Sequence, residues 1–214
     1  YPKIYRNDGG PYRLGVPAPT AAPTVAVTGT ADLDELEESR SYVVTFVTSW
    51  GEEGPPSSAT TPVSFRDGQS VTVNLPSIPT TAGLNFNSGA LKRIYRTNTG
   101  STSTGFQFVA EVAYTATTYT DTIANNALGE VIPSVTWMRP PDDDTTLFPT
   151  GAMQGLCSIG NGIMAGFTGK RLCFSEPYLP HAWPVSSRIT LEEEIVAIGM
   201  AGNGLIVTTK GTPY

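Results

Sequence analysis

The chain has 214 residues, and its 13 lysine and arginine residues against 19 aspartate and glutamate residues give a net charge of −6 at pH 7. This acidic balance argues against a strongly basic nucleic-acid-binding protein. The apolar runs are far shorter than the ~20 residues that a membrane-spanning helix needs, so no membrane span is expected. The 22 glycines and 18 prolines exclude long uninterrupted helices and favour many short strands joined by turns.

The chain has too few cysteine and histidine residues for a disulfide framework or for most catalytic triads and metal sites. Cys157 and Cys173 are too few for a disulfide framework, and we expect free buried thiols, although their spacing also allows them to face each other across a hairpin. His181 is the single histidine, which limits nucleophilic triads and metal sites. No cofactor is therefore expected. A strand is expected after the turn Lys210-Gly211-Thr212-Pro213, so the sequence is interpreted as part of a longer polypeptide.

The first 23 residues are predicted to form a hairpin followed by a linker. Lys3-Ile4-Tyr5-Arg6 and Tyr12-Arg13-Leu14-Gly15 flank the turn Asn7-Asp8-Gly9-Gly10. Residues 17–23 contain three prolines, which fix φ and remove backbone donors, so this stretch is expected to be stiff and extended. It leads into a new module.

Residues 24–134 are predicted to be nearly all strand. Residues 41–50 alternate in a way that leaves both faces apolar enough for a sandwich core. The one helix-like stretch, residues 32–39, is too short to organise a fold. Further strands are predicted over residues 59–65, 71–75, 92–96, 106–112 and 117–121.

These strands resemble a fibronectin type III domain in a changed order. Residues 71–75, 93–97, 106–112 and 118–122 are similar to strands B, C, C′ and E of that family. Tyr42-Val43-Val44-Thr45-Phe46-Val47, with the Gly51-Glu52-Glu53-Gly54-Pro55-Pro56-Ser57 stretch, resembles its F strand, F–G turn and G strand. In the family F and G follow E, whereas here they precede B. The resemblance therefore implies a circularly permuted sandwich, or another β-sandwich topology, and permutation is feasible because sandwich termini lie at the surface.

Residues 135–214 follow a different pattern. Gly160-Asn161-Gly162 precedes a short apolar run, and Gly202-Asn203-Gly204 precedes another roughly 40 residues later, which is close to the blade period of a β-propeller. Two unrelated hairpins are the alternative, because Asn-Gly turns are common. A propeller needs about four to eight blades, so further blades are expected elsewhere in the same chain. The predicted fold is thus all-β: a fibronectin type III-like sandwich (residues 24–134) inserted in part of a β-propeller (residues 1–23 and 135–214).

The most distinctive segment is residues 173–184. Ser175, Glu176 and His181 suggest a hydrolytic set, but the Gly-x-Ser-x-Gly elbow is absent and three prolines make the segment a rigid connection. We expect Tyr178 and Trp183 to pack over a blade edge, with His181 bound to a backbone group. These three residues are therefore candidates for a structural or interface role.

Three acidic side chains in a row, Asp142, Asp143 and Asp144, offer oxygen ligands for a hard cation. They lack the glycine and the distal glutamate of a calcium loop, so a solvated loop between modules or an interface is the favoured interpretation. The Glu192-Glu193-Glu194 run is expected to be a solvated turn or a subunit contact.

Aromatic residues at strand positions suggest a sugar platform, but in a sandwich such residues are more often core residues or cross-strand pairs. They are Tyr42, Phe46, Trp50, Tyr95, Phe106 and Phe108.

The combination resembles virion structural proteins of tailed bacteriophages, and is similar to tail nozzle or tail tubular proteins of short-tailed phages. The motifs that carry the resemblance are Tyr12-Arg13-Leu14-Gly15-Val16-Pro17-Ala18-Pro19, Gly162-Ile163-Met164-Ala165-Gly166-Phe167 and residues 174–184. The resemblance implies a non-catalytic ring in the virion tail, assembled in the host cytoplasm, that contacts other tail or adaptor proteins. It implies no catalytic, cofactor-binding or metal-binding residues. Genomic DNA would pass through the ring without specific binding, and an acidic chain suits this because cationic walls would retain phosphates.

Two other functions remain open at this point. One is an extracellular adhesion protein that binds a glycan or a receptor. The other is a propeller glycosidase, which needs paired carboxylates about 5–10 Å apart in one pocket.

Overall fold

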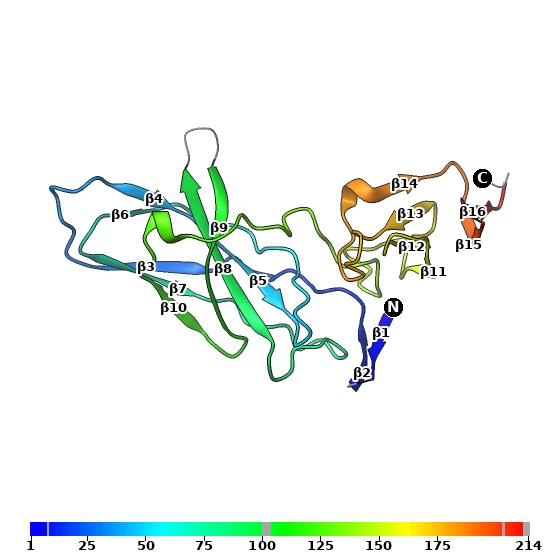
Figure 1. Cartoon of the computed structure of the whole chain (residues 1–214), viewed down its shortest axis with the longest axis horizontal. Helices are drawn as coiled ribbons and strands as arrows, with labels where there is room; N and C mark the ends of the chain where they lie inside the picture. The colour runs from blue at the N-terminus through cyan, green and yellow to red at the C-terminus, as the bar shows by residue number, and fades with distance from the viewer. Residues whose placement is uncertain (8, 100–103, 203, 212–214) are drawn as a thin grey trace. The chain divides into compact units, whose positions relative to one another are not determined.

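The computed structural model describes residues 1–7, 9–99, 104–202 and 204–211 (Figure 1). Its only helical elements in these ranges are the short 3-10 turns η1 (Asn125–Ala127) and η2 (Val185–Ser187), so the predicted all-β class is confirmed. No helix in the described ranges is long and apolar enough to cross a membrane. The chain divides into unit 1 (Tyr1–Pro17, Ala82–Asn85 and Thr136–Tyr214) and unit 2 (Ala18–Thr81 and Phe86–Val135).

Unit 2 contains two three-stranded antiparallel sheets and a small third sheet. The first has the order β10-β7-β3, the second has the order β5-β8-β9, and β4 pairs with β6 (Figure 1). The strand bounds are β3 (Thr24–Gly29), β4 (Glu38–Arg40), β5 (Tyr42–Val47), β6 (Val63–Phe65), β7 (Gln69–Asn74), β8 (Leu91–Thr99), β9 (Thr104–Ala113) and β10 (Thr118–Asp121).

One hydrophobic core joins the two larger sheets of unit 2. Tyr42 and Val44 from β5 and Ile94 from β8 pack in one cluster with Val71 and Val73 from β7, and none of the five is exposed. Because side chains alternate along a strand, each strand contributes every second residue to this core. Burying each large apolar side chain contributes about 1.5–3 kcal/mol to the stability of the unit. Because the two sheets share this core, they form a sandwich-like body.

The free edge of β5 is protected by the segment that follows it. The backbone N–H groups of Gly54, Ser57 and Thr60 donate to carbonyls of β5, each at 2.9 Å. The hydroxyls of Ser57 and Thr60 in turn accept hydrogen bonds from the N–H groups of Val44 and Tyr42. This sheet edge is therefore satisfied without a regular strand, which removes a site for unwanted strand pairing.

Two local predictions for unit 2 are wrong. Residues 32–39 form turns followed by the start of β4 at Glu38, with no helix. The strand predicted over residues 59–65 is confined to Val63–Phe65. It pairs with β4, because the residues before it are occupied along β5.

Unit 1 begins with a hairpin, as predicted, but its second strand starts at Gly9, inside the predicted turn, and ends at Arg13. β1 (Lys3–Arg6) pairs antiparallel with β2 (Gly9–Arg13), although Asp8 of the predicted turn lies outside the described residues. Farther along, four strands pair in chain order, and a second hairpin of β15 and β16 follows them. The bounds are β11 (Gln154–Ser158), β12 (Met164–Thr168), β13 (Arg171–Phe174), β14 (Arg188–Thr190), β15 (Ile195–Ala201) and β16 (Gly204–Thr209).

Both faces of the four-stranded sheet are covered. On one face, Cys173 packs with Leu14, Met153 and Trp183, and Ile4 of β1 packs against the same cluster. On the other face, buried side chains of β12 and β13 form a cluster with residues of the β15–β16 hairpin: Phe167, Leu172, Ile195 and Val207. The sheet is thus the middle layer of a stack whose outer layers come from different parts of the chain.

The turn between β11 and β12 needs glycine. Gly160, Asn161 and Gly162 have φ values of 94°, 48° and 69°, in the left-handed region that L side chains rarely adopt. A Cβ on Gly162 would lie 2.4 Å from the ring of Tyr178. In the second Gly-Asn-Gly turn, Gly202 has a φ of 59°, while Asn203 lies outside the described residues.

The idea that the two cysteines face each other across a hairpin is wrong. Cys157 lies on β11 and Cys173 on β13, with β12 between them, and both thiols are free. Burial raises the pKa of each thiol, which favours the protonated form.

Candidate functional site

Within residues 173–184 of unit 1, Tyr178 and Trp183 differ greatly in exposure. Trp183 is fully buried, and its Nε1–H donates to the Pro180 carbonyl at 2.8 Å. Tyr178 is 77% exposed, yet its backbone N–H donates to the Gly162 carbonyl at 2.9 Å. Trp183 thus serves the interior of the unit, whereas Tyr178 presents its ring to solvent beside the β11–β12 turn.

His181 is buried and lies edge-on to the Trp137 ring, with 5.9 Å between ring centroids. Burial, together with the positive charge of Arg6, lowers the pKa of His181 to about 4. The imidazole is therefore neutral at pH 7.

We predict that this depressed pKa makes unit 1 sensitive to acid. Between the ordinary pKa of 6.5 and the folded pKa of about 4, the unfolded chain binds the proton and the folded chain does not, so stability falls as the pH drops through this window. The loss reaches roughly 2 kcal/mol at about pH 5, since each pKa unit corresponds to about 1.4 kcal/mol. His181→Phe, which keeps a ring beside Trp137, should remove this part of the pH dependence. Urea unfolding of both proteins at pH 7 and pH 5 tests it, and equal losses in the two would contradict it.

The Ser175, Glu176 and His181 trio is not arranged around a free nucleophile. The Ser175 hydroxyl oxygen accepts a hydrogen bond from the Met164 N–H at 2.9 Å, and the hydroxyl donates to the Glu176 carbonyl at 3.0 Å. The serine therefore ties two backbone segments together.

The three consecutive aspartates all form ion pairs, with two arginines between them. Arg13 binds the Asp143 carboxylate through two nitrogens and lies 3.6 Å from Asp142. Arg139 contacts Asp142 at 3.0 Å and Asp144 at 2.8 Å. Hydrogen bonding to Arg13 lowers the pKa of Asp143. Among the described residues no group of three or more candidate ligands is placed to hold a metal ion, so the cluster orders a loop through ion pairs.

The Glu192-Glu193-Glu194 run is also tied into unit 1. The Lys170 ammonium donates to the Glu192 carbonyl at 2.5 Å, and Lys210 pairs with the Glu194 carboxylate. The run forms part of a turn whose ends are fixed by two lysines.

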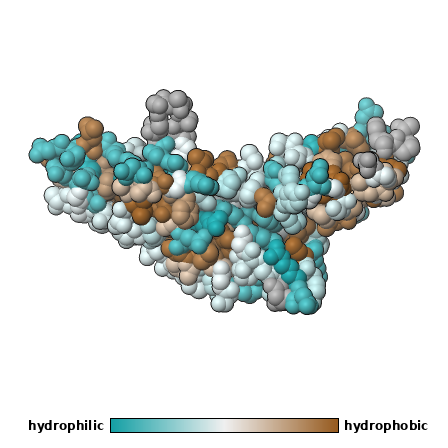
Figure 2. Space-filling view, in the orientation of Figure 1, coloured by the Kyte–Doolittle hydropathy of each residue, from teal (hydrophilic) through white to brown (hydrophobic). Residues whose placement is uncertain are grey.

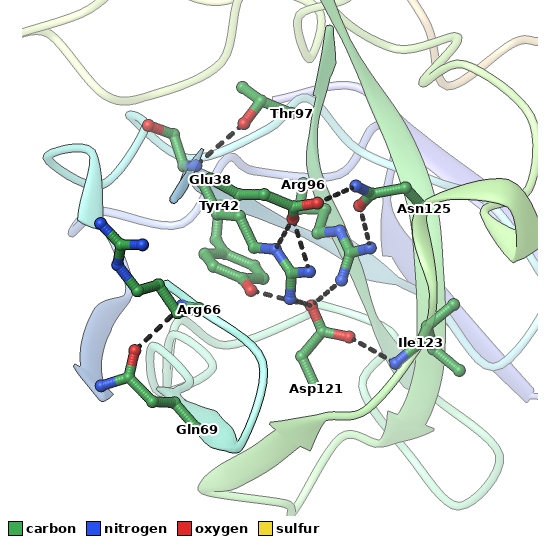
Figure 3. Close-up of polar contacts among 11 residues, drawn as sticks. Glu38, Tyr42, Arg66, Gln69, Arg96, Thr97, Asp121, Ile123 and Asn125 are labelled. Atoms are coloured by element: carbon green, nitrogen blue, oxygen red, sulfur yellow. Dashed lines mark hydrogen bonds and ion pairs between the residues drawn. The ribbon is translucent and has the colours of Figure 1, made fainter. Parts of the chain in front are cut away.

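Unit 2 contains a buried charge network that sequence analysis did not identify. Figure 3 shows Tyr42, Arg96 and Asp121 converging from β5, β8 and β10. Arg96 contacts the Asp121 carboxylate at 2.5 Å, and neither side chain is exposed. The Tyr42 hydroxyl donates to the same carboxylate at 2.8 Å. Burial and the neighbouring Asp121 charge raise the pKa of Tyr42, so it remains a donor.

The network continues to the surface at a small polar pocket. Arg96 donates to Asn125 at 2.7 Å, Asn125 donates to Glu38 at 2.8 Å, and Glu38 accepts from Arg40 at 2.9 Å. The pocket has a volume of about 240 Å³ and is lined by Glu38, Ser39, Arg40, Thr97, Asn98 and Asn125. Its charges pair with one another, so the arrangement fits a structural clamp between the strands of the two sheets.

A larger pocket opens on the outer face of the β5-β8-β9 sheet. It has a volume of about 460 Å³ and combines the rings of Tyr95 and Phe108 with the carboxylates of Glu53, Glu111 and Glu130. The two rings lie edge to face, with 5.8 Å between centroids. Residues 129–132 form the opposite wall by pairing with β9, for example through the Phe108 N–H to the Glu130 carbonyl at 2.9 Å.

Glu53 lines this pocket, and the residue is buried. Its carboxylate accepts hydrogen bonds from Thr45 at 2.6 Å, Tyr95 at 2.7 Å and Arg93 at 2.7 Å. Burial alone would lower the pKa of Arg93, but hydrogen bonds to Glu111 and Glu53 raise it above its usual value. The lining therefore carries three carboxylates against one guanidinium, an electrostatic environment that favours cationic over anionic groups.

The predicted aromatic platform is not formed as a single surface. Tyr42 and Phe46 are buried, with Tyr42 in the core between the two sheets, whereas Tyr95 packs on the opposite face of its sheet with Phe106 and Phe108. These five residues serve as core residues or cross-strand pairs, the interpretation that the sequence favoured, and Trp50 lies in the turn after β5.

Comparison with known protein families and with curated protein sequences gives no match for this chain.

Proposed function

We propose that this protein is a non-catalytic structural component of a bacteriophage tail, part of a nozzle or tail-tube ring around the DNA exit channel. The observation that carries the proposal is the stack in unit 1. A four-stranded antiparallel sheet in chain order is covered on one face by the next hairpin, and on the other by earlier residues together with Trp183 from the β13–β14 connection. Successive propeller blades pack in this way.

The exposed side of the β15–β16 hairpin supports the same proposal. Val196 and Ile206 are 57% and 48% exposed, and Ile206 alternates with Val207 so that it lies on the face turned away from the four-stranded sheet. Apolar surface of this kind on a two-stranded hairpin is suited to packing against a further sheet. Figure 2 shows hydrophobic side chains over this hairpin on the face in view.

Strand pairing in unit 2 supports a permuted fibronectin type III-like sandwich. β7 pairs with β10, as strands B and E do, and β5 pairs with β8, which pairs with β9, as F, C and C′ do. The segment after β5 lies along its free edge, where strand G would lie. β3 takes the place of strand A beside β7, although it precedes the F-like strand in the chain.

The charge of the chain fits a channel that DNA passes through. The net charge of −6 repels phosphates, so the genome would not be retained by the wall. Ion-paired arginines, such as Arg13, Arg93 and Arg96, stabilise the fold and are not gathered as a free basic surface.

We predict that the protein assembles into a closed cyclic oligomer in the virion, in contact with other tail or adaptor proteins. Native mass spectrometry of the full-length protein should give one discrete oligomer, and electron microscopy of particles should show it as a ring in the tail. A protein that remains monomeric under all assembly conditions and is absent from purified particles would contradict the proposal.

A further inference from the structure

Two surfaces of this chain carry opposite charges beside exposed apolar side chains, and we propose that they bind each other between neighbouring copies. One is the acidic loop of residues 32–37 in unit 2. The other is the β14 edge of unit 1, which we define as Val185, Arg188 and Ile189. The inference rests on the proposed function, since it names a contact through which subunits of a ring would join.

The acidic loop exposes two leucines to an unusual degree. Leu36 and Leu33 are 87% and 79% exposed, more than any other large apolar side chain in the described part of the chain. Asp32, Asp34, Glu35 and Glu37 surround them. Figure 2 shows hydrophilic side chains gathered where β3 leads towards β4, with hydrophobic side chains among them.

The loop is held in position although its leucines are exposed. Arg66 donates to the Glu35 carbonyl at 2.5 Å and to the Glu37 carboxylate at 3.3 Å. The Asp32 N–H donates to the Asp67 carbonyl at 2.8 Å. A loop ordered in this way loses little conformational freedom on binding, which favours its use as a docking element.

The β14 edge offers apolar surface at the end of a sheet. β14 pairs only with β13, so it is the last strand of its sheet. Val185 and Ile189 are 55% and 51% exposed. Side chains alternate along β14, so Ile189 lies on the face of Leu172 and Arg188 on the face of Cys173, and only a loop that docks over the open edge of the strand contacts both.

Arg188 gives this edge a positive charge without an ion-pair partner among the described residues. Its Nε is buried without a hydrogen-bond partner, and its Nη2 contacts only the Met138 sulfur, at 3.7 Å. In the described part of the chain no carboxylate lies within ion-pair distance of it. Arg171, across from Thr190 of β14, adds a second cation. A half-buried unpaired guanidinium is costly, and a carboxylate from the acidic loop would compensate it.

The contact would be head to tail. Like charges repel, so a contact between copies pairs the acidic loop of one subunit with the β14 edge of the next. Such heterologous contacts generate rings when the rotation closes.

The test compares association of full chains by sedimentation velocity and native mass spectrometry. Leu33→Ser/Leu36→Ser removes the apolar part of the loop, and Arg188→Gln removes the cation of the edge. Each should weaken association at least ~10-fold, since a few central residues carry most of the energy of an interface. Equimolar mixing of the two variants should give dimers and no larger species, because each retains one intact surface.

Charge reversal provides an independent arm. Asp34→Lys/Glu35→Lys and Arg188→Glu should each abolish association, and their combination in one chain should restore part of it. Matched controls reverse charges outside the two surfaces, with Glu130→Lys for unit 2 and Lys3→Glu for unit 1, and should leave association unchanged. Circular dichroism of every variant verifies that it is folded, and the loop variants lie in a different unit from Arg188, so misfolding of one arm does not remove the other.

The outcomes separate this inference from the ring proposal. If rings form and the loop and edge variants leave them intact, the docking contact is wrong and the ring stands. If the control reversals dissociate the ring equally, the effect is general repulsion and the contact is also wrong. A wild-type chain that never associates would overturn both.

Discussion

Replacing Asp121 with alanine is expected to destabilise unit 2 by about 3–5 kcal/mol, because it leaves a buried charge without its partner. Arg96 and Asp121 are in contact at 2.5 Å and both side chains are fully buried. The same carboxylate accepts hydrogen bonds from the Tyr42 hydroxyl at 2.8 Å and the Ile123 N–H at 3.0 Å. Its loss would leave the buried Arg96 guanidinium without the carboxylate that it contacts, and would also remove a carboxylate 3.9 Å from Arg40. Urea unfolding followed by circular dichroism measures the effect, and hydrogen exchange should localise it to β8 and β10.

Two controls distinguish this mechanism from a general sensitivity to mutation. Asp121→Leu/Arg96→Met removes both charges together and should cost less than Asp121→Ala alone, because no unpaired charge remains. Glu194→Ala breaks an exposed ion pair with Lys210 and should change little. A loss for Asp121→Ala no larger than that for Glu194→Ala would show that the buried pair does not act as a clamp.

Periodicity in the sequence was sufficient to predict the class of fold and several elements. Residues 42–47 alternate with apolar side chains on both faces, and β5 is buried at all six positions. The glycines and the asparagine of residues 160–162 indicated a tight turn, and their positive φ values show why these residues are needed. Such features depend on neighbours in the chain, which is why sequence alone reveals them.

Periodicity could not predict where the segment that follows β5 becomes a regular strand. Residues 59–65 have a strand-like composition, but Thr60 is bound along β5 and only residues from Val63 onward form a strand. Pro55 and Pro56 have no N–H to donate, so Ser57 and Thr60 satisfy β5 partly through their hydroxyls. This arrangement depends on where β5 lies in space and has no local signal.

The sequence could predict that two charged residues point towards the core, but it could not predict that they pair. Arg96 is in phase with Ile94 on β8, and Asp121 is in phase with Tyr119 on β10, so alternation alone places both charges towards the core. Their pairing, however, requires that β8 and β10 belong to facing sheets. The ion pair between Arg13 and Asp143 spans 130 positions of sequence and has no local signal at all.

Trp183→Ala is expected to destabilise unit 1 by about 3–5 kcal/mol, the range found when a large buried aromatic is truncated. Trp183 is fully buried against Leu14, Met153 and Cys173, and its N–H groups bind the Pro180 and Met138 carbonyls. Truncation opens a cavity on one face of the four-stranded sheet and leaves the Pro180 carbonyl without its donor. Urea unfolding should show the loss, and hydrogen exchange should accelerate in β12 and β13.

The control for this truncation is Tyr5→Ala on β1, an aromatic residue that is 67% exposed, which should change stability by less than about 0.5 kcal/mol. The cover of this face matters for more than stability, since it is one of the two layers between which the four-stranded sheet is packed. If Trp183→Ala unfolds at the same urea concentration as the parent chain and β12 keeps its protection, then the packing of Trp183 on this face is dispensable. In that case the stacked-sheet interpretation of unit 1 loses its main support.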